Sequence, residues 1–184
     1  MTYRHLILDR DGVLNYAAPP PGFVLRPQDF RWLPGALEAL TILRAAGIRL
    51  SVASNQSGVG RGLMSLADLH AVNDRMQADA AAAGGALDAV FCCPHAPEAG
   101  CDCRKPEPGL IRAAIARSGI SADESLVVGD DERDLQAAQR AGVRAALVRT
   151  GKGRVTEGRL ADRSSATVVY DDFLALTRAI TGDQ

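Results

Sequence analysis

Short apolar runs alternate along the chain with longer stretches in which apolar residues recur at helical spacing. The short runs are rich in Leu, Val, Ile and Ala, which is typical of buried strands. We predict strands at residues 5–9, 49–54, 89–92, 126–130, 145–149 and 167–170. The helical spacing between them predicts helices at residues 36–46, 66–83, 109–118 and 134–141.

Strands that alternate with helices predict an α/β fold, a parallel sheet with helices on both faces. Ser65 and Asp68 fit a helix-capping box. Two irregular segments, 16–30 and 93–108, interrupt the pattern, and long loops in compact domains tend to be functional. Because no inserted stretch is large enough for a second domain, we predict a single domain over residues 1–184.

Composition and charge narrow the classes of function. Apolar residues make up 47% of the chain and the formal net charge is −1, which gives no general attraction for nucleic acid or an anionic membrane. The N-terminus lacks the apolar stretch of a signal peptide, and no run is long enough to span a membrane. We therefore predict a cytoplasmic monomer that binds neither nucleic acid nor membrane. In that reducing compartment, four cysteines within twelve residues indicate a metal before a disulfide.

Acidic residues stand where several predicted strands end. Asp9 and Asp11 come at the end of the first strand, and Asp130 ends a later one. Ligands of open parallel sheets bind beyond the carboxyl ends of the strands, so we expect these residues to share one rim. Converging carboxylates raise one another's pKa values, and a bound hard cation removes that conflict. Oxygen ligands beside a phosphate suit Mg²⁺.

This set of residues predicts phosphoryl transfer to a carboxylate. Asp9 is a competent nucleophile at phosphorus and would form an acyl phosphate. Asp11 could protonate the leaving oxygen and later activate water. The Ser54 hydroxyl and nearby backbone N–H groups could hold the phosphoryl oxygens, while Lys105 neutralises their charge. A single aspartate after a strand is more often a helix cap or a turn residue, so the prediction depends on the full set in this order.

Four segments, DRDGVLN (9–15), SNQSG (54–58), RKP (104–106) and GDDERD (129–134), resemble the motifs of the haloacid dehalogenase superfamily. The resemblance covers residues 6 to about 150 and implies a Rossmann-like sheet without a separate cap domain. It implies that Asp9 is the phosphorylated nucleophile, that Asp11 is the general acid and base, and that Asp134 supports the site. It also implies Mg²⁺ bound by Asp9, the backbone carbonyl of Asp11, and Asp130. The predicted substrate-binding residues are Ser54, Asn55, Gln56, Ser57, Arg104 and Lys105.

The segment FCCPHAPEAGCDCRKPEPG resembles a zinc-loop subgroup of this superfamily. The resemblance implies four Zn²⁺ ligands, Cys93, His95, Cys101 and Cys103, and three thiolates with one imidazole form a usual structural zinc site. It leaves Cys92 as a buried strand residue, because the Cys-Pro-His triplet supplies the first two ligands. Inert or disulfide-bonded cysteines are the alternative, and a nucleic-acid-binding zinc module would need a basic surface. The loop leads directly into Arg104 and Lys105, so we interpret it as a device that positions them.

Members of that subgroup act on D-glycero-D-manno-heptose 1,7-bisphosphate or on histidinol phosphate. We predict hydrolysis of the 7-phosphate of the heptose bisphosphate, because Arg104 beside Lys105 suits a substrate with a second anionic group. Histidinol phosphate or another small phosphorylated metabolite is the alternative. Two departures from the heptose-bisphosphate pattern favour a weaker hold on the remote phosphate. Asp131 stands where a Lys is frequent, and residues 16–21 form an apolar, proline-rich segment where an acidic residue is frequent.

Two other functions share parts of this pattern. A signalling receiver domain also phosphorylates an aspartate near Mg²⁺, but its acidic pair and phosphoacceptor would come in a different strand order. A polynucleotide 3′-phosphatase shares the nucleophile motif, and the near-neutral charge disfavours its substrate. The glycine-rich segments 58–62 and 151–153 lack the Lys-Ser/Thr ending of a P-loop, and we interpret the second as a mobile turn.

Overall fold

The computed structural model describes residues 3–17, 22–160 and 167–182, and its centre is one six-stranded parallel sheet. The strands are β1 (His5–Leu8), β2 (Arg49–Asn55), β3 (Ala89–Cys93), β4 (Ser125–Gly129), β5 (Arg144–Val148) and β6 (Val168–Tyr170). Their order across the sheet is β3-β2-β1-β4-β5-β6. This confirms the predicted α/β class with a Rossmann-like parallel sheet.

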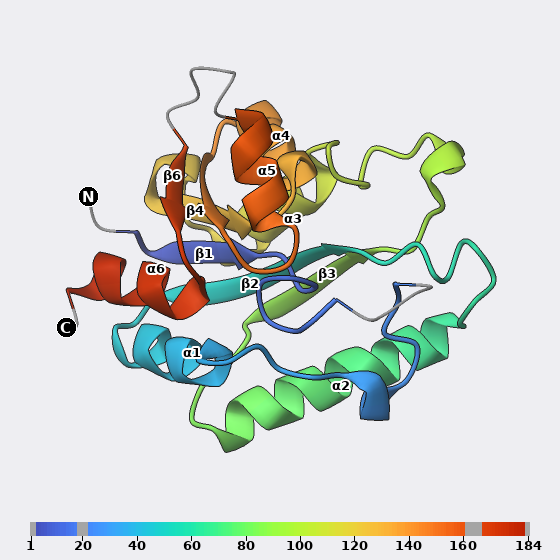
Figure 1. Ribbon diagram of the computed structural model, residues 1–184, viewed down its shortest axis with the longest axis horizontal. Helices are drawn as coiled ribbons and strands as arrows, with labels where there is room; N and C mark the ends of the chain where they lie inside the picture. The colour runs from blue at the N-terminus through green and yellow to red at the C-terminus, as the bar shows by residue number, and fades with distance from the viewer. Residues whose placement is uncertain (1–2, 18–21, 161–166, 183–184) are drawn as a thin grey trace.

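Helices cover both faces of the sheet. They are α1 (Ala36–Ala45), α2 (Leu66–Ala82), α3 (Gly109–Ser118), α4 (Glu132–Ala141), α5 (Gly153–Leu160) and α6 (Phe173–Thr181). Figure 1 shows α1, α2 and α6 on one side of the sheet and α3, α4 and α5 on the other. Short 3-10 turns occur at η1 (Pro27–Asp29), η2 (Pro97–Ala99) and η3 (Ala122–Glu124). Within the described ranges, no helix is long and apolar enough to cross a membrane.

Side-chain alternation along the strands creates two apolar cores. Leu6 and Leu8 of β1 face one way and join the larger core with α1, α2 and α6. Ile7, between them, faces the other way and joins the core under α3 and α4. All three side chains are fully buried. A strand buried on both faces reads as a continuous apolar run, which is why the sequence marked β1 so clearly.

The structure corrects the predicted elements mainly at their ends. Helix α3 has the predicted bounds, and the other predicted elements begin or end within two residues of the prediction. The largest shift is in α4, which begins early because Asp131 caps it and forms a capping box with Asp134. The box predicted for Ser65 and Asp68 is confirmed. Helices α5 and α6 were not predicted.

The strand order places the site. From β1 the chain moves outward through β2 to β3, then returns to add β4 on the other side of β1. The direction of winding therefore reverses between β1 and β4, and open α/β sheets bind ligands at this switch point, beyond the carboxyl ends of the strands. Asp9 follows β1 and Asp130 follows β4. Within the described ranges, no second sheet or helical domain stands over this edge.

Candidate active site and metal centre

A cavity of about 450 Å³ opens at the carboxyl edge of the sheet. It is lined by every residue predicted for catalysis, phosphate binding or Mg²⁺ binding: Asp9, Asp11, Ser54, Asn55, Gln56, Ser57, Arg104, Lys105 and Asp130. The loops after β1, β2 and β4 and the segment before α3 thus supply one site, as the strand-end argument predicted.

Three carboxylates converge on the floor of this cavity. Oxygen atoms of Asp9, Asp130 and Asp134 lie within 4.8 Å of one another. Burial raises the pKa of Asp9 despite the ammonium of Lys105, and burial together with the Asp9 carboxylate raises the pKa of Asp130. Such a group of oxygen ligands, with more negative than positive charge, fits a hard divalent cation such as Mg²⁺.

Lys105 places a positive charge among the carboxylates on the floor of the cavity. Its Nζ lies 2.9 Å from Asp9 Oδ1 and 2.5 Å from Asp134 Oδ1, and its side chain is only 4% exposed. Burial alone would lower the pKa of Lys105, but the Asp134 and Asp9 carboxylates raise it above its usual value. The ammonium therefore stays charged. The other Asp134 oxygen, Oδ2, accepts a hydrogen bond from the backbone N–H of Asp131 at 3.0 Å, so Asp134 supports both Lys105 and the start of α4.

Two glycines make room for Asp130. A Cβ added at Gly12 or at Gly151 would lie 2.1 Å from Asp130 Oδ2, and both glycines have positive φ, 98° and 56°. The Thr150 hydroxyl donates to the backbone carbonyl of Gly12 at 2.6 Å, which ties the two glycine turns together. The backbone N–H of Lys152 donates to Asp130 Oδ2 at 2.8 Å. Only glycine fits at these two positions, and the carboxylate is held in a narrow slot.

The Asp11 side chain points into a separate hydrogen-bond network. Its Oδ2 accepts from Gln56 Nε2 at 2.6 Å and from Arg10 Nη2 at 3.2 Å, and its Oδ1 accepts from Asn15 Nδ2 at 2.9 Å. Arg10 is fully buried and also donates to Gln56 Oε1 at 2.9 Å. Asp11 does not belong to the group of converging carboxylates. This position is compatible with both roles predicted for Asp11. The carboxylate was predicted to transfer protons, and the backbone carbonyl was predicted to bind Mg²⁺.

The Asn55 side chain positions the segment that carries Lys105. Asn55 Nδ2 donates to the backbone carbonyl of Lys105 at 2.9 Å, and the backbone N–H of Lys105 donates to Asn55 Oδ1 at 3.0 Å. The Gln56 amide is likewise occupied, since it donates to Asp11 and to Ser54 Oγ. Both side chains therefore hold other site residues in place, and their contact with a phosphate stays a prediction.

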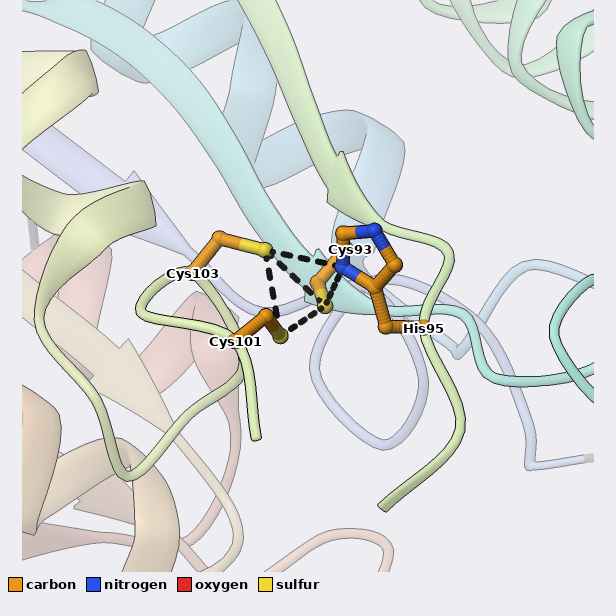
Figure 2. Close-up of side chains that lie close together, drawn as sticks. All are labelled: Cys93, His95, Cys101 and Cys103. Atoms are coloured by element: carbon orange, nitrogen blue, oxygen red, sulfur yellow. Dashed lines mark hydrogen bonds between the residues drawn. The ribbon is translucent and has the colours of Figure 1, made fainter. Parts of the chain in front are cut away.

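The four residues predicted to bind zinc form a compact group beside the sheet edge (Figure 2). Cys103 Sγ lies 3.2 Å from Cys93 Sγ, 3.5 Å from Cys101 Sγ and 3.3 Å from His95 Nδ1. Cys93 Sγ lies 3.6 Å from both Cys101 Sγ and His95 Nδ1. These separations are far longer than a disulfide bond of about 2.05 Å. They approach the edges of roughly 3.5–3.8 Å that follow from a tetrahedron with Zn²⁺ bond lengths. The cysteines are free thiols, so the disulfide alternative is wrong for this structure.

Cys92 stands apart from this group and lies in β3, as predicted, but it is half-buried and not buried as was predicted. Its Sγ accepts a hydrogen bond from Asn73 Nδ2 at 3.5 Å, and burial raises the pKa of its thiol. The four-residue metal group does not include it. Adjacent strand residues point to opposite faces of a sheet, which separates Cys92 from Cys93.

Backbone hydrogen bonds tie the Cys/His loop to the cavity. The N–H of Gln56 donates to the carbonyl of Cys93 at 2.7 Å, and the N–H of Gly60 donates to the carbonyl of Pro94 at 2.8 Å. A Cβ at Gly60 would lie 2.5 Å from the backbone nitrogen of Ala96, so the two loops approach too closely for another residue. Arg104 Nη1 donates to the carbonyl of His95 at 3.4 Å. The loop therefore supports both Gln56 and the segment that leads to Lys105.

Three further charged residues, which were not predicted as site residues, line the cavity: Asp131, Arg133 and Lys152. The Asp131 carboxylate accepts from Arg133 Nε at 2.9 Å and Nη2 at 2.8 Å, and from Lys152 Nζ at 3.1 Å. A turn was predicted at residues 151–153, and the structure has one at residues 150–152, with Gly153 already in α5. This turn is part of the site. The sequence signal that could have identified this turn as part of the site was its position directly after the apolar run of β5. Residues 18–21 of the proline-rich segment lie outside the described residues.

Comparisons with known proteins agree with this geometry. The profile of the HAD-hydrolase-like family matches residues 102–176. The chain is 42% identical over 177 residues to the D-glycero-β-D-manno-heptose-1,7-bisphosphate 7-phosphatase of Bordetella bronchiseptica, covering 95% of this chain and 96% of that protein. It is 39% identical over 175 residues to the enzyme of the same name from Pseudomonas putida, covering 95% and 98%.

Solved structures give the same relationship. The crystal structure of the D,D-heptose 1,7-bisphosphate phosphatase from B. bronchiseptica, complexed with magnesium and phosphate, superposes with a TM-score of 0.90 at 41% identity, covering 98% of this chain and 99% of that one. The Burkholderia thailandensis phosphatase of the same name superposes with a TM-score of 0.73 at 38% identity, covering 97% and 98%. The resemblance inferred from the four motifs is thereby confirmed across nearly the whole chain.

Proposed function

Because this chain belongs to the haloacid dehalogenase-like hydrolase family, we propose that it is a phosphatase that removes the 7-phosphate of D-glycero-β-D-manno-heptose 1,7-bisphosphate. The observation that carries the proposal is the position of Asp9, which follows β1 at the switch point and lies 2.9 Å from the Lys105 ammonium in a cavity lined by carboxylates. The full-length identity to phosphatases of this heptose bisphosphate supports the substrate.

The first chemical step transfers the phosphoryl group to Asp9. One carboxylate oxygen of Asp9 attacks phosphorus, and the bond between phosphorus and the sugar oxygen breaks. Asp11 gives a proton to that oxygen, which leaves as the free hydroxyl. Lys105, with the Ser54 hydroxyl, binds the phosphoryl oxygens as their charge develops. The sugar then departs and leaves an aspartyl phosphate on Asp9.

The second step regenerates the carboxylate. A water molecule gives a proton to Asp11 and attacks the phosphorus, and the bond between phosphorus and the Asp9 oxygen breaks to release inorganic phosphate. The hydrogen bonds from Gln56, Asn15 and Arg10 hold the Asp11 carboxylate in a fixed position for these proton transfers.

Two metals have suitable ligands. Asp9, the backbone carbonyl of Asp11 and Asp130 would hold Mg²⁺, which when bound supplies positive charge to the phosphoryl oxygens. Cys93, His95, Cys101 and Cys103 would hold Zn²⁺ as a structural ion, because these four ligands complete a tetrahedral site without an open position. We further expect a single-domain monomer in the cytoplasm, and these three points stay predictions.

The substrate is tested by comparing kcat/KM for both anomers of the heptose bisphosphate with kcat/KM for histidinol phosphate. We expect the β anomer to be preferred. If histidinol phosphate is preferred by tenfold or more, which corresponds to about 1.4 kcal/mol of transition-state binding, the heptose assignment should be abandoned for the alternative. Phosphate release from none of the three would remove the proposed function itself.

A further inference from the structure

The distribution of lysine in this chain is uneven. Only two of its 21 basic residues other than histidine are lysines, Lys105 and Lys152, and both line the cavity. The first is buried on the floor, where Asp9 and Asp134 occupy its ammonium group. The side chain of Lys152 is 62% exposed, so it stands where the cavity meets solvent. The two lysines therefore line the same cavity, one at its floor and the other at its opening to solvent.

The backbone of Lys152 is fixed although its side chain is exposed. Its N–H donates to Asp130 Oδ2 at 2.8 Å, and the preceding Gly151 packs against the same carboxylate. The turn that carries it connects β5 to α5. Lys152 thus projects from a rigid point of attachment on the metal-binding edge, and its position depends little on the mobility of a surface loop.

Asp131 brings Lys152 together with a second cation. The Asp131 carboxylate accepts two hydrogen bonds from the Arg133 guanidinium and one from the Lys152 ammonium. Two cations held by one carboxylate leave a net positive charge at this rim. The lysine ammonium has three N–H donors, and within the described part of the chain its hydrogen bond to Asp131 uses one of them. The remaining donors are available to a ligand.

We propose that Lys152 and Arg133, gathered by Asp131, form a subsite that binds the second phosphate of a bisphosphorylated sugar while the first lies at Asp9. This inference rests on the proposed function and names the residues that would select a bisphosphate. Asp131 acts as an internal counterion, because two neighbouring cations would otherwise repel each other and separate before a ligand arrives. Charge-assisted hydrogen bonds to a phosphate are among the strongest in proteins, so such a clamp favours a doubly phosphorylated substrate.

The subsite also changes the interpretation of Asp131. In the sequence, Asp131 stands where a Lys is frequent in the heptose-bisphosphate pattern. The change from a cation to an anion predicted weaker binding of the remote phosphate. In the structure the anion is paired with two cations that come from α4 and from the turn before α5. The positive charge at this rim is therefore supplied from elsewhere in the chain.

The experiment compares the heptose 1,7-bisphosphate with the heptose 7-phosphate, which differ only in the second phosphate. Lys152→Met and Arg133→Met should each lower kcat/KM for the bisphosphate at least tenfold more than for the monophosphate, mainly through KM. Arg154→Met is the matched control. It also removes one positive charge, two residues after Lys152, but the Arg154 side chain is exposed and does not line the cavity. Lys152→Arg should keep most of the discrimination.

Binding without turnover gives a second readout. In an Asp9→Asn background, calorimetry should show that Lys152→Met weakens the bisphosphate at least tenfold more than the monophosphate. Equal losses for the two substrates, or the same loss with Arg154→Met, would overturn the subsite and leave the proposed function standing. A wild-type protein that releases phosphate from neither substrate would remove both.

Discussion

The loop at residues 93–103 supplies all four of its candidate metal-ligand side chains from eleven consecutive residues, whereas the carboxylate site takes Asp9 from the end of β1, Asp130 from the end of β4 and Asp134 from α4. The carboxylate site faces a cavity of about 450 Å³, and none of the four Cys/His side chains lines that cavity. One site can admit a substrate and the other is closed by its own ligands.

The two sites also depend on an ion for different reasons. Burial and the nearness of the two carboxylates raise the pKa values of Asp9 and Asp130, so without a cation these two groups bind protons more readily than usual. The Cys/His loop is short of apolar side chains and contains two prolines and a glycine between its ligands, so it needs a metal to define its conformation. We therefore propose that a cation in the first site would serve chemistry and that a cation in the second would serve structure. The predictions below test this division.

The largest effect is expected at Asp9. Asp9→Asn keeps the shape of the side chain but removes the nucleophile, so phosphate release should fall by at least about 10³-fold while the circular dichroism spectrum stays unchanged. Asp11→Asn is the companion variant. It should lose about 10²–10⁴-fold, and mass spectrometry should still find the phosphoryl group on Asp9. Near-normal turnover by Asp9→Asn, or an adduct on another residue, contradicts the mechanism.

Removal of a thiolate should affect the closed site first. Cys103→Ser should release the zinc, lower the melting temperature, and reduce kcat/KM by about 10–100-fold, because the segment before Lys105 loses its support. Cys92→Ser is the matched control and should keep about one zinc per chain. Metal analysis and thermal denaturation distinguish the outcomes. Full zinc occupancy in Cys103→Ser, or zinc loss in Cys92→Ser, would show that the ligands are assigned incorrectly.

Magnesium should stabilise the protein by relieving repulsion on the cavity floor. At a concentration of 100 Kd, the unfolding free energy should rise by about 2.7 kcal/mol. Because the pKa values of Asp9 and Asp130 are raised, the folded metal-free protein binds more protons than the unfolded chain. Its stability should therefore fall as pH rises above their usual value of 3.8, and Mg²⁺ should remove that loss.

The variant Asp9→Asn also serves as the control for the magnesium effect. This variant should be more stable than the wild type without metal, because one repelling carboxylate is gone, and it should gain less from Mg²⁺. Thermal denaturation across pH, with and without Mg²⁺, measures both quantities. An equal gain in the two proteins would place the stabilising ion elsewhere.

The smallest effect is expected at His5, which is remote from both sites. His5 Nε2 lies 2.9 Å from Ser51 Oγ, and the ring is fully buried. Burial lowers the pKa of His5 from 6.5 to about 4, so the folded state favours the neutral ring. Stability should therefore fall as pH drops from 6.5 towards 4, a trend opposite to that of the carboxylates. His5→Gln should flatten this part of the stability curve; the same slope in both proteins would assign the trend to another group.

Local patterns in the sequence were sufficient for several features. The apolar runs identified the six strands of the described residues. The signal has a clear cause in β1 and β4, because a strand buried on both faces must be apolar almost throughout. The Cys/His group was also visible, since its residues are close in sequence, although the choice of Cys93 over Cys92 came from the resemblance to the zinc-loop subgroup. Asp9 and Asp130 could be paired before the structure was known, because the carboxyl ends of parallel strands meet at one edge.

Other features depended on how distant segments pack. Helix α5 contains two glycines and gave little helical signal, yet its Thr156 donates to the Asp130 backbone carbonyl and its Gly153 fits where a Cβ would lie 1.7 Å from the Val148 carbonyl oxygen. Arg10 is a charged residue, a type that is rarely fully buried, and yet the structure buries it completely beside Asp11. Contacts with remote residues outweighed local propensity in both cases.

The rim of the cavity shows the same limit most clearly. From the sequence, Asp131 indicates the loss of a cation at this position. The structure shows instead that α4 and the turn before α5 bring two cations, Arg133 and Lys152, beside it. Composition and spacing determine which groups a chain carries and where its strands lie, because those depend on near neighbours. The charge that a ligand meets depends on distances between remote residues, and these are set by the packing of the whole sheet and its helices.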